Sequence, residues 1–393
     1  MFETAGMDHR NVVPGFRIGR ICHLRIRWMS STRVALHFEA GYPCPIGFKK
    51  QVATMRFSLH GLLGMALVGL AVSAQVAVAD ELQDLASAAG KKGPIIWFES
   101  SQPEHIVKVV AAFNKRYPNI RIQYVRSTGG GGIAARIIQE AEAGAPTASF
   151  VIADVQALIP LNQRGLLVSR NWKALGVGPA LVATPYAVSA TAALSVVLWN
   201  KNRVADNQVP NTWEDFLAER WKGKIGVWVR APTLAALAKS SGEQHMRDYT
   251  RKLVALNAMI YSSTYQLAQQ IAAGEVDVGI GLYHSAQPVL AAGAPVGLRF
   301  LDPTPVNSLY GAVISKGGNP EGAQVLLAWL VSLEGAQAYE AAVGRGNPLV
   351  KGTQAAEIVG SRKLAEWSFD ESTKLEKLDA EFTQILMTAG KPR

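Results

Sequence analysis

The stretch PIIWFESSQPEHIVKVVAAFNKRYPNIRIQYV (residues 94–125) decides the predicted fold. Its first apolar run, residues 95–98, predicts a strand that is buried on both faces. Apolar residues then recur at spacings of three and four between residues 106 and 117, which predicts a helix, and Pro118 ends it. Residues 120–125 alternate between apolar and polar, as a second strand does. The order strand, helix, strand predicts a parallel sheet with a crossover helix.

Short apolar runs with the same character recur further along the chain. Residues 150–153, 224–229 and 276–282 each predict another buried strand. Residues 187–199 are rich in small and β-branched residues, which predicts one long strand or two, and such a segment suits a connection that crosses between two lobes. A chain of 393 residues is also too long for one ordinary core.

These patterns predict an α/β fold of two doubly wound lobes joined by a hinge. We expect residues 80–190 and 300–393, with the C-terminal helices, mainly in the first lobe. Residues 191–299 are expected mainly in the second lobe.

The positive charge of the chain is concentrated at its start. The formal net charge is +10, but residues 1–79 hold nine of the 40 Lys and Arg residues and only three of the 30 Asp and Glu residues. The net charge from residue 80 onward is therefore only +4. No basic stripe with interleaved aromatic residues remains in that part, which argues against a nucleic-acid partner.

Residues that catalysis commonly uses are scarce. Both cysteines, Cys22 and Cys44, precede residue 80, so the remaining chain has no disulfide, thiolate zinc site or cysteine nucleophile of its own. Its three histidines, His105, His245 and His284, lie in no H-E-x-x-H motif, and no G-x-S-x-G motif is present. We therefore predict that the protein is not an enzyme; an enzyme built on the same lobes is the less favoured alternative.

Residues 55–79 resemble a secretion signal. An arginine precedes the uncharged apolar run of residues 61–72, and Ala-Val-Ala follows directly before Asp80. The apolar run is short for a bilayer core of about 30 Å, which disfavours a membrane anchor. We predict cleavage before Asp80 and a periplasmic mature protein, with residues 1–54 outside it because the start codon was assigned too early.

Four blocks of sequence resemble one known family, in its order along the chain. They are FNKRYP at 113–118, VPNTWEDF at 209–216 with RWKGKIG at 220–226, AAGEVDVG at 272–279, and GNPEGA at 318–323. The chain is thereby similar to bacterial periplasmic solute-binding proteins of ABC importers, in the cluster of ferric-iron-binding proteins. The resemblance implies a type 2 periplasmic-binding-protein architecture that closes on a small ligand or metal ion. It also implies a monomer that delivers this ligand to an ABC permease in the inner membrane and needs no cofactor.

Iron is one ligand that the resemblance implies. Iron-binding relatives hold Fe(III) with two adjacent tyrosines at the end of the strand that corresponds to residues 276–282, where this chain has Tyr283 and His284. The family's glutamate corresponds to Glu142, or less well to Glu140, and a histidine found in some members corresponds to a position near Gln102. Tyr283, His284 and Glu142 are thus the candidate metal ligands for transported Fe(III).

A small anion, such as a phosphate ester, phosphonate or carboxylate, is the alternative ligand. Hydroxyl groups and glycine N–H groups at predicted helix starts favour anions, although such residues also serve as ordinary helix caps. An arginine after a second-lobe strand offers a bidentate contact to an anion. The candidate ligand-binding residues for either ligand are Ser100, Ser101, Gln102, Ser127, Thr128, Gly129, Arg230, Thr233, Ser262, Ser263 and Tyr283.

Overall fold

The computed structural model divides the chain into two compact units, Met1–Val76 and Ala77–Arg393. It describes residues 23–30, 33–39, 81–127 and 130–388. In the first unit, the described strands β1 (His23–Ser30) and β2 (Arg33–Glu39) pair antiparallel. The predicted secretion signal at residues 55–79 lies outside the described residues. None of the helices described in the chain is long and apolar enough to span a membrane.

The first lobe of the second unit is built on parallel strands, as the opening stretch predicts. Strand β3 (Ile95–Glu99) lies between β4 (Ile122–Arg126) and β5 (Phe150–Ala153), and all three run in one direction. The helices that follow these strands are α2 (Pro103–Arg116), α3 (Gly130–Glu142) and α4 (Val155–Gln163).

The second lobe repeats this arrangement. Strand β8 (Ile225–Trp228) lies between β9 (Met259–Tyr261) and β10 (Val278–Leu282), again in parallel. The helices of this lobe are α5 (Pro232–Ser241), α6 (Glu243–Ala255), α7 (Thr264–Ala273) and α8 (Tyr283–Ala291).

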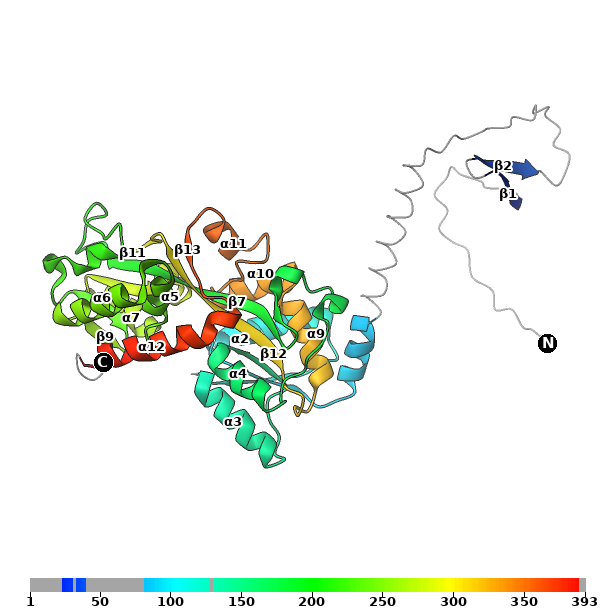
Figure 1. Cartoon of the computed structure of the whole chain (residues 1–393), viewed down its shortest axis with the longest axis horizontal. Coiled ribbons are helices and arrows are strands. Elements are labelled where there is room, and N and C mark those ends of the chain that lie inside the picture. The colour runs from blue at the N-terminus through cyan, green and yellow to red at the C-terminus, as the bar shows by residue number, and fades with distance from the viewer. Residues whose placement is uncertain (1–22, 31–32, 40–80, 128–129, 389–393) are drawn as a thin grey trace. The chain divides into compact units, whose positions relative to one another are not determined.

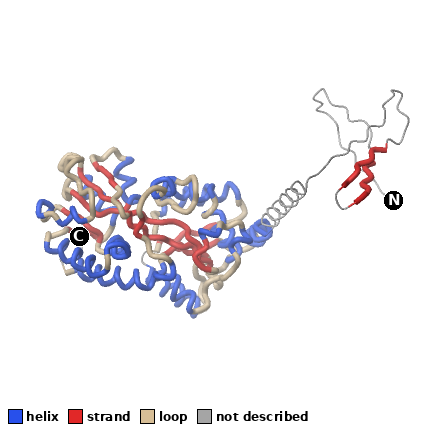
Figure 2. Tube along the Cα trace, turned by 45° about the horizontal axis from the view of Figure 1, so that its top comes forward, coloured by secondary structure: helices blue, strands red, loops and turns tan. Residues whose placement is uncertain are grey.

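Two long strands join the lobes. Strand β7 (Ala187–Asn200) pairs through residues 188–194 with β12 (Thr304–Val313), and through its later residues with β10 and β11 (Val296–Arg299). Strand β12 also pairs with β5, so one sheet of eleven described strands continues through both lobes. Two short strands, β6 (Val182–Thr184) and β13 (Leu364–Ala365), complete it. In Figure 1, β7 and β12 lie where the two lobes meet, and Figure 2 shows the strands inside with helices around them.

Apolar side chains cover both faces of the sheet in each lobe. Successive residues of one strand point to opposite faces, so Trp97 and Phe98 belong to different buried clusters. Val196 and Val197 of β7 do the same in the second lobe. Because both faces are buried, the strands consist of continuous apolar runs with little alternation, which made them recognisable in the sequence.

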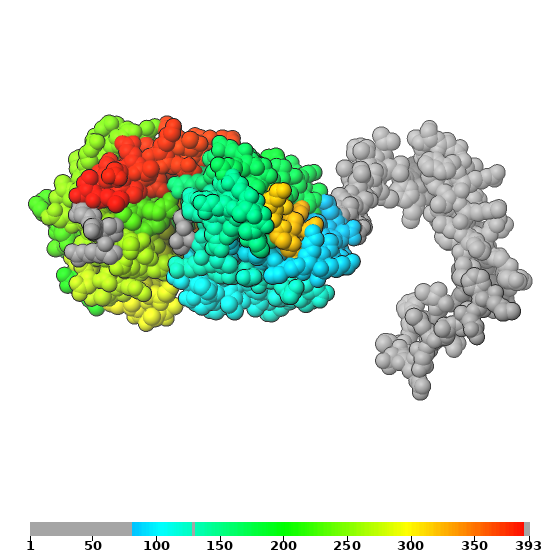
Figure 3. Space-filling model, turned by 90° about the horizontal axis from the view of Figure 1, so that it is seen from below, coloured from blue at the N-terminus to red at the C-terminus, as the bar shows by residue number. Residues whose placement is uncertain are grey.

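The C-terminal segment divides between the lobes. Helices α9 (Pro320–Leu330) and α10 (Leu333–Val343) pack on the first lobe, and the short α11 (Gln354–Val359) follows. Helix α12 (Ser372–Met387) instead packs on α5 and α6, with Phe382 in the core of the second lobe. We expected residues 300–393 mainly in the first lobe, whereas the apolar stripe of α12 packs on the outer face of the second. Figure 3 shows this segment in red on the molecular surface.

Candidate ligand-binding cleft

A cavity of about 420 Å³ lies between the two lobes, and we call it the cleft. Polar and aromatic residues of the first lobe line it: Ser100, Arg126, Asp154 and Arg345. Those of the second lobe are Trp228, Arg230, Thr233, Ser262, Ser263, Thr264, Tyr265 and His284. Ser195 and Asn307 of the joining strands complete the polar lining. A ligand in this cavity therefore contacts both lobes and the strands that connect them.

Several helices begin at the edge of the cleft, because the parallel strands before them end there. Gly130 at the start of α3, Pro232 at the start of α5 and Thr264 at the start of α7 all line it. Helix α8 begins at Tyr283, directly after the lining residue Leu282. The N–H groups of a first helical turn lack partners within the helix and lie at the positive end of its dipole. The cleft is thus surrounded by groups that favour an anion.

Gly130 allows α3 to begin close to the first-lobe carboxylate. A Cβ atom on this residue would lie 1.8 Å from Oδ1 of Asp154, so a larger residue would fit only if Asp154 or the helix moved. Gly130, which follows the predicted ligand-binding residue Gly129, therefore has a packing role of its own.

Six of the predicted site residues line the cleft: Ser100, Arg230, Thr233, Ser262, Ser263 and His284. Ser263 is the N-cap of α7, and its hydroxyl accepts a hydrogen bond from the N–H of Tyr265 at 3.2 Å. The hydroxyl of Thr233 is hydrogen-bonded to that of Ser195 at 2.8 Å, which ties α5 to β7. Ser263 thus both caps a helix and faces the cavity.

Other predicted residues lie away from the cleft lining. Ser101 is buried below it, and Gln102 is the half-buried N-cap of α2. Ser127 lies half-buried just after β4. Thr128 and Gly129 lie outside the described residues.

The structure does not bring the three candidate metal ligands together. Glu142 is the last residue of α3, whereas Gly130 at the cleft is its first, and this length of helix spans about 18 Å. The exposed carboxylate of Glu142 forms an ion pair with Arg164 at 3.1 Å. Glu142 therefore lies at the end of α3 that faces away from the cleft.

Tyr283 and His284 are adjacent in the chain but differ in their surroundings. The ring of Tyr283 packs against Phe300, with centroids 5.6 Å apart, and lines a separate cavity of about 380 Å³. His284 lines both this cavity and the cleft. Within the described part of the chain, no group of three His, Cys, Asp or Glu side chains is arranged to hold a metal ion.

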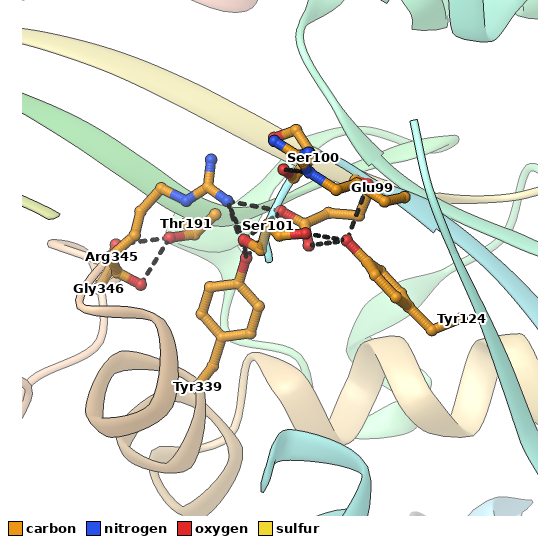
Figure 4. Close-up of polar contacts among 9 residues, drawn as sticks. Glu99, Ser100, Ser101, Tyr124, Thr191, Tyr339, Arg345 and Gly346 are labelled. Carbon is orange, nitrogen blue, oxygen red and sulfur yellow. Dashed lines mark hydrogen bonds and ion pairs between the residues drawn. The ribbon is translucent and has the colours of Figure 1, made fainter. Parts of the chain in front are cut away.

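A buried hydrogen-bond network centred on Arg345 lies beneath the cleft (Figure 4). Its Nη2 atom donates to Oε1 of Glu99 at 2.5 Å, to the hydroxyl of Ser101 at 2.7 Å and to that of Tyr339 at 3.1 Å. Glu99 is wholly buried, and Arg345 is only 6% exposed. A buried carboxylate is tolerated only where such partners compensate its lost hydration. Glu99 and Arg345 therefore hold each other in place.

Arg345 also faces the cleft. Among the described residues, its Nε atom has no hydrogen-bond partner. The neighbouring Gly346 carbonyl accepts hydrogen bonds from the N–H of Ala192 at 2.8 Å and from the Thr191 hydroxyl at 2.9 Å, which attaches this loop to β7. A guanidinium fixed from below, with a donor still unused by the described residues, suits a carboxylate or phosphate ligand. Sequence reasoning missed Arg345, whose only local signal is its position between two glycines.

Two further arginines line the cleft. Arg126 ends β4, and its Nε donates to the carbonyl of Ser100 at 3.1 Å while its side chain remains exposed. Arg230 follows β8, and its Nη2 lies 2.9 Å from Asp379 and 3.7 Å from Asp154. Of the described residues that line the cleft, Asp154 alone is an Asp or Glu. Cationic side chains therefore outnumber carboxylates on the cleft surface.

His284 contributes a neutral polar group. It is 8% exposed, and its ring packs edge-on against Tyr265 with centroids 5.9 Å apart. Burial, with a smaller effect of Arg345, lowers the pKa of His284 well below its ordinary value of 6.5. No described residue is a hydrogen-bond partner of its buried Nδ1 atom. A neutral imidazole can donate one hydrogen bond to a ligand and accept another.

Known proteins are similar to this chain in sequence or in fold. A Fe(3+)-binding periplasmic protein from Serratia marcescens is 24% identical over 327 residues, covering 74% of this chain and 89% of the relative. The structure of AfuA from Actinobacillus pleuropneumoniae with exogenous fructose-6-phosphate bound has a TM-score of 0.62 at 19% identity, covering 75% of this chain and 99% of that chain. The substrate-binding protein of the ABC transporter from Agrobacterium tumefaciens has a TM-score of 0.63 at 20% identity, with coverages of 75% and 95%.

These similarities confirm the predicted fold class, a mixed α/β structure of the type 2 periplasmic-binding-protein architecture. The family model of the bacterial extracellular solute-binding proteins matches residues 108–365, more than half of the 393 residues. The match confirms the resemblance found in the sequence and the interpretation of the chain as a binding protein instead of an enzyme. The chain therefore belongs to the family of bacterial extracellular solute-binding proteins.

Proposed function

We propose that this protein captures a small organic anion, such as a phosphate ester, phosphonate or carboxylate, in the cleft and delivers it to its permease. The observation that carries this proposal is the lining of the cleft. Arg126, Arg230 and Arg345 contribute cationic groups, whereas Asp154 is the one carboxylate among the described lining residues. The helix N-termini around the cavity add further donors for an anion.

The size of the cleft favours an organic molecule over a bare ion. Its volume of about 420 Å³ falls in the range of roughly 300–1,000 Å³ that is typical of small-molecule pockets. Trp228 and Tyr265 line it and provide aromatic surface for the apolar part of a ligand. A compact anion with a carbon skeleton would use both the donors and the aromatic rings.

The groups that would contact the ligand lie on both lobes, and this arrangement explains how the protein would capture it. Arg126 and Ser100 belong to the first lobe, and Arg230 and Ser263 to the second. A ligand that contacts both sets favours the conformation in which the lobes are close, and a permease can then recognise that conformation. We propose that the mature protein, beginning at Asp80, does this in the periplasm as a monomer.

Ferric iron is the competing ligand, and the name of the Serratia marcescens relative is its main support. In this chain, Glu142 lies at the far end of α3 and Tyr283 lines the separate cavity. His284 is the one candidate metal ligand at the cleft. We therefore favour the anion.

Native mass spectrometry of the protein purified from the periplasm tests this proposal directly. Denaturation then releases the ligand for identification. We expect a monomer that starts at Asp80 and releases an organic anion without metal. Release of iron would contradict the proposed ligand, and retention of residues 1–54 would contradict the proposed processing.

A further inference from the structure

Three carboxylates meet one arginine at the junction of the lobes. Beside the cleft lies a narrow cavity of about 30 Å³, whose lining includes Asp154, Arg230, Glu376 and Asp379. Asp154 follows β5 in the first lobe, and Arg230 follows β8 in the second. Glu376 and Asp379 come from α12, which packs on the second lobe. The cluster therefore contains side chains from both lobes.

Arg230 connects the carboxylates across this junction. Its Nη2 atom lies 2.9 Å from Oδ2 of Asp379 and 3.7 Å from Oδ2 of Asp154. The other carboxylate oxygen of Asp379 accepts the N–H of Ala231 at 2.8 Å, so this residue is held firmly in the second lobe. The contact of Arg230 with Asp154 is thus an ion pair between lobes.

The negative charge in this cluster exceeds the positive charge. Among the described residues, neither Oε1 of Glu376 nor Oδ1 of Asp154 has a hydrogen-bond partner, and both atoms are buried. The lining of this small cavity includes one further titratable group, Tyr310 on β12, and burial raises its pKa to about 12, so it is neutral. One arginine therefore faces three carboxyl groups in a partly dehydrated place.

This surplus makes protonation favourable. Burial, and then the neighbouring Asp154 and Asp379, raise the pKa of Glu376 to about 7 despite the opposing effect of Arg230. Burial also raises the pKa of Asp154. A neutral Glu376 leaves Arg230 to pair with the two aspartates.

We propose that this cluster is a pH-sensitive latch, in which a proton on Glu376 stabilises the joined state of the two lobes. The inference rests on the proposed function, in which the lobes close to capture a ligand, and it adds a control of that closure.

The direction of the pH dependence follows from the pKa of Glu376, which is higher when the lobes are joined than when they are apart. When the lobes part, α12 loses its contact with α4 of the first lobe, so Glu376 is less buried and Asp154 leaves, and the pKa of Glu376 falls toward its ordinary 4.5. The joined state then holds more protons between these two values, so closure is favoured at acidic pH and weakens as the pH rises through 7. Glu376 is only partly buried, and solvent screening reduces the effect to roughly a threefold change in the closure equilibrium between about pH 6 and pH 8.

Distance measurements between spin labels on ligand-free full-length protein test the latch. The labels are placed at Val107→Cys on α2 and Lys252→Cys on α6, both exposed positions, after Cys22→Ser and Cys44→Ser. We expect the ratio of longer to shorter distances to rise about threefold from pH 6 to pH 8, and Glu376→Gln to abolish that rise. Glu381→Gln on the same helix is the matched control, because it pairs with Arg247 away from the cluster, and it is expected to keep the rise.

Two results would overturn the latch: distances that do not change with pH, or a change that persists in Glu376→Gln. Carbon-13 titration of the Glu376 carboxyl in the unaltered chain is the second measurement. A midpoint near 7 supports the latch, and one near 4.5 overturns it. Both measurements omit the ligand, so their outcome is separate from the identification of an anion or of iron.

Discussion

The guanidinium of Arg345 lies 2.5 Å from the carboxylate of Glu99, and both side chains are buried beneath the cleft. The two residues are 246 positions apart in the sequence. The pair joins the end of β3 to the loop after α10, and that loop is in turn hydrogen-bonded to β7. A ligand that contacts Arg345 therefore contacts a loop that is hydrogen-bonded to β7, the strand that passes between the lobes.

Glu99→Gln is expected to lower the free energy of unfolding by about 3 kcal/mol, because it leaves a buried guanidinium without a counter-charge. Urea denaturation of the two proteins measures the difference. Glu334→Gln is the matched control: it breaks an exposed ion pair with Arg116 at 3.4 Å, which is worth no more than about 0.5 kcal/mol. Equal losses in both variants would show that the buried pair has no special role.

Arg126→Ala is expected to weaken binding of the released anion at least tenfold, or about 1.4 kcal/mol, because it removes an exposed cationic donor from the cleft. The loss should shrink at high salt, which screens this charge. Isothermal titration calorimetry at low and high salt measures the affinity and its salt dependence. Arg121→Ala, an exposed arginine just before the opposite end of β4, is the control and is expected to bind as the unaltered protein does. Equal affinity of Arg126→Ala would remove this residue from the site.

The fold was predictable because the strands consist of continuous apolar runs and the helices have regular apolar stripes. Residues 95–98 and 106–117 show both patterns, and they correspond to β3 and α2. The position of α12 was not predictable in the same way. Its apolar residues, such as Leu378 and Phe382, indicate a buried face but carry no information about which lobe covers it.

The cleft was only partly predictable. Ser100, Arg230 and Ser263 follow strand ends, where an α/β sheet presents its ligand, so the sequence pattern selected them. Arg345 reaches the cleft from a loop after α10, and its role depends on Glu99 far away in the sequence. The prediction of Tyr283 as a ligand failed to place its side chain at the cleft for another reason. A strand end in the sequence indicates the edge of the sheet but not the direction of the side chain.

Tyr283→Phe distinguishes the two ligands. If the ligand is an anion in the cleft, the variant is expected to bind it within about twofold of the unaltered protein, because the phenol lines the separate cavity. If the ligand is iron, loss of the phenolate should weaken binding at least tenfold, on the order of 1.4 kcal/mol. Affinities for the purified anion and for ferric citrate measure the difference. A large loss of anion affinity would place Tyr283 at the anion site.

His284→Gln is expected to make stability less sensitive to acid. Burial, and to a smaller extent Arg345, lower the pKa of His284 well below its ordinary 6.5, so the unfolded chain takes up a proton that the folded protein excludes. As the pH falls from about 7.5 to 5, protonation of this residue in the unfolded chain costs the folded state at most about 2 kcal/mol. Urea denaturation at both pH values measures the free energy of unfolding. We expect this free energy to fall less between the two pH values in His284→Gln than in the unaltered protein. His245→Gln, an exposed imidazole beside Glu214, is the control and is expected to keep the full loss. An equal loss in His284→Gln and the unaltered protein would mean that this imidazole accepts a proton in the folded state, and the cleft would then present one more cation to an anionic ligand.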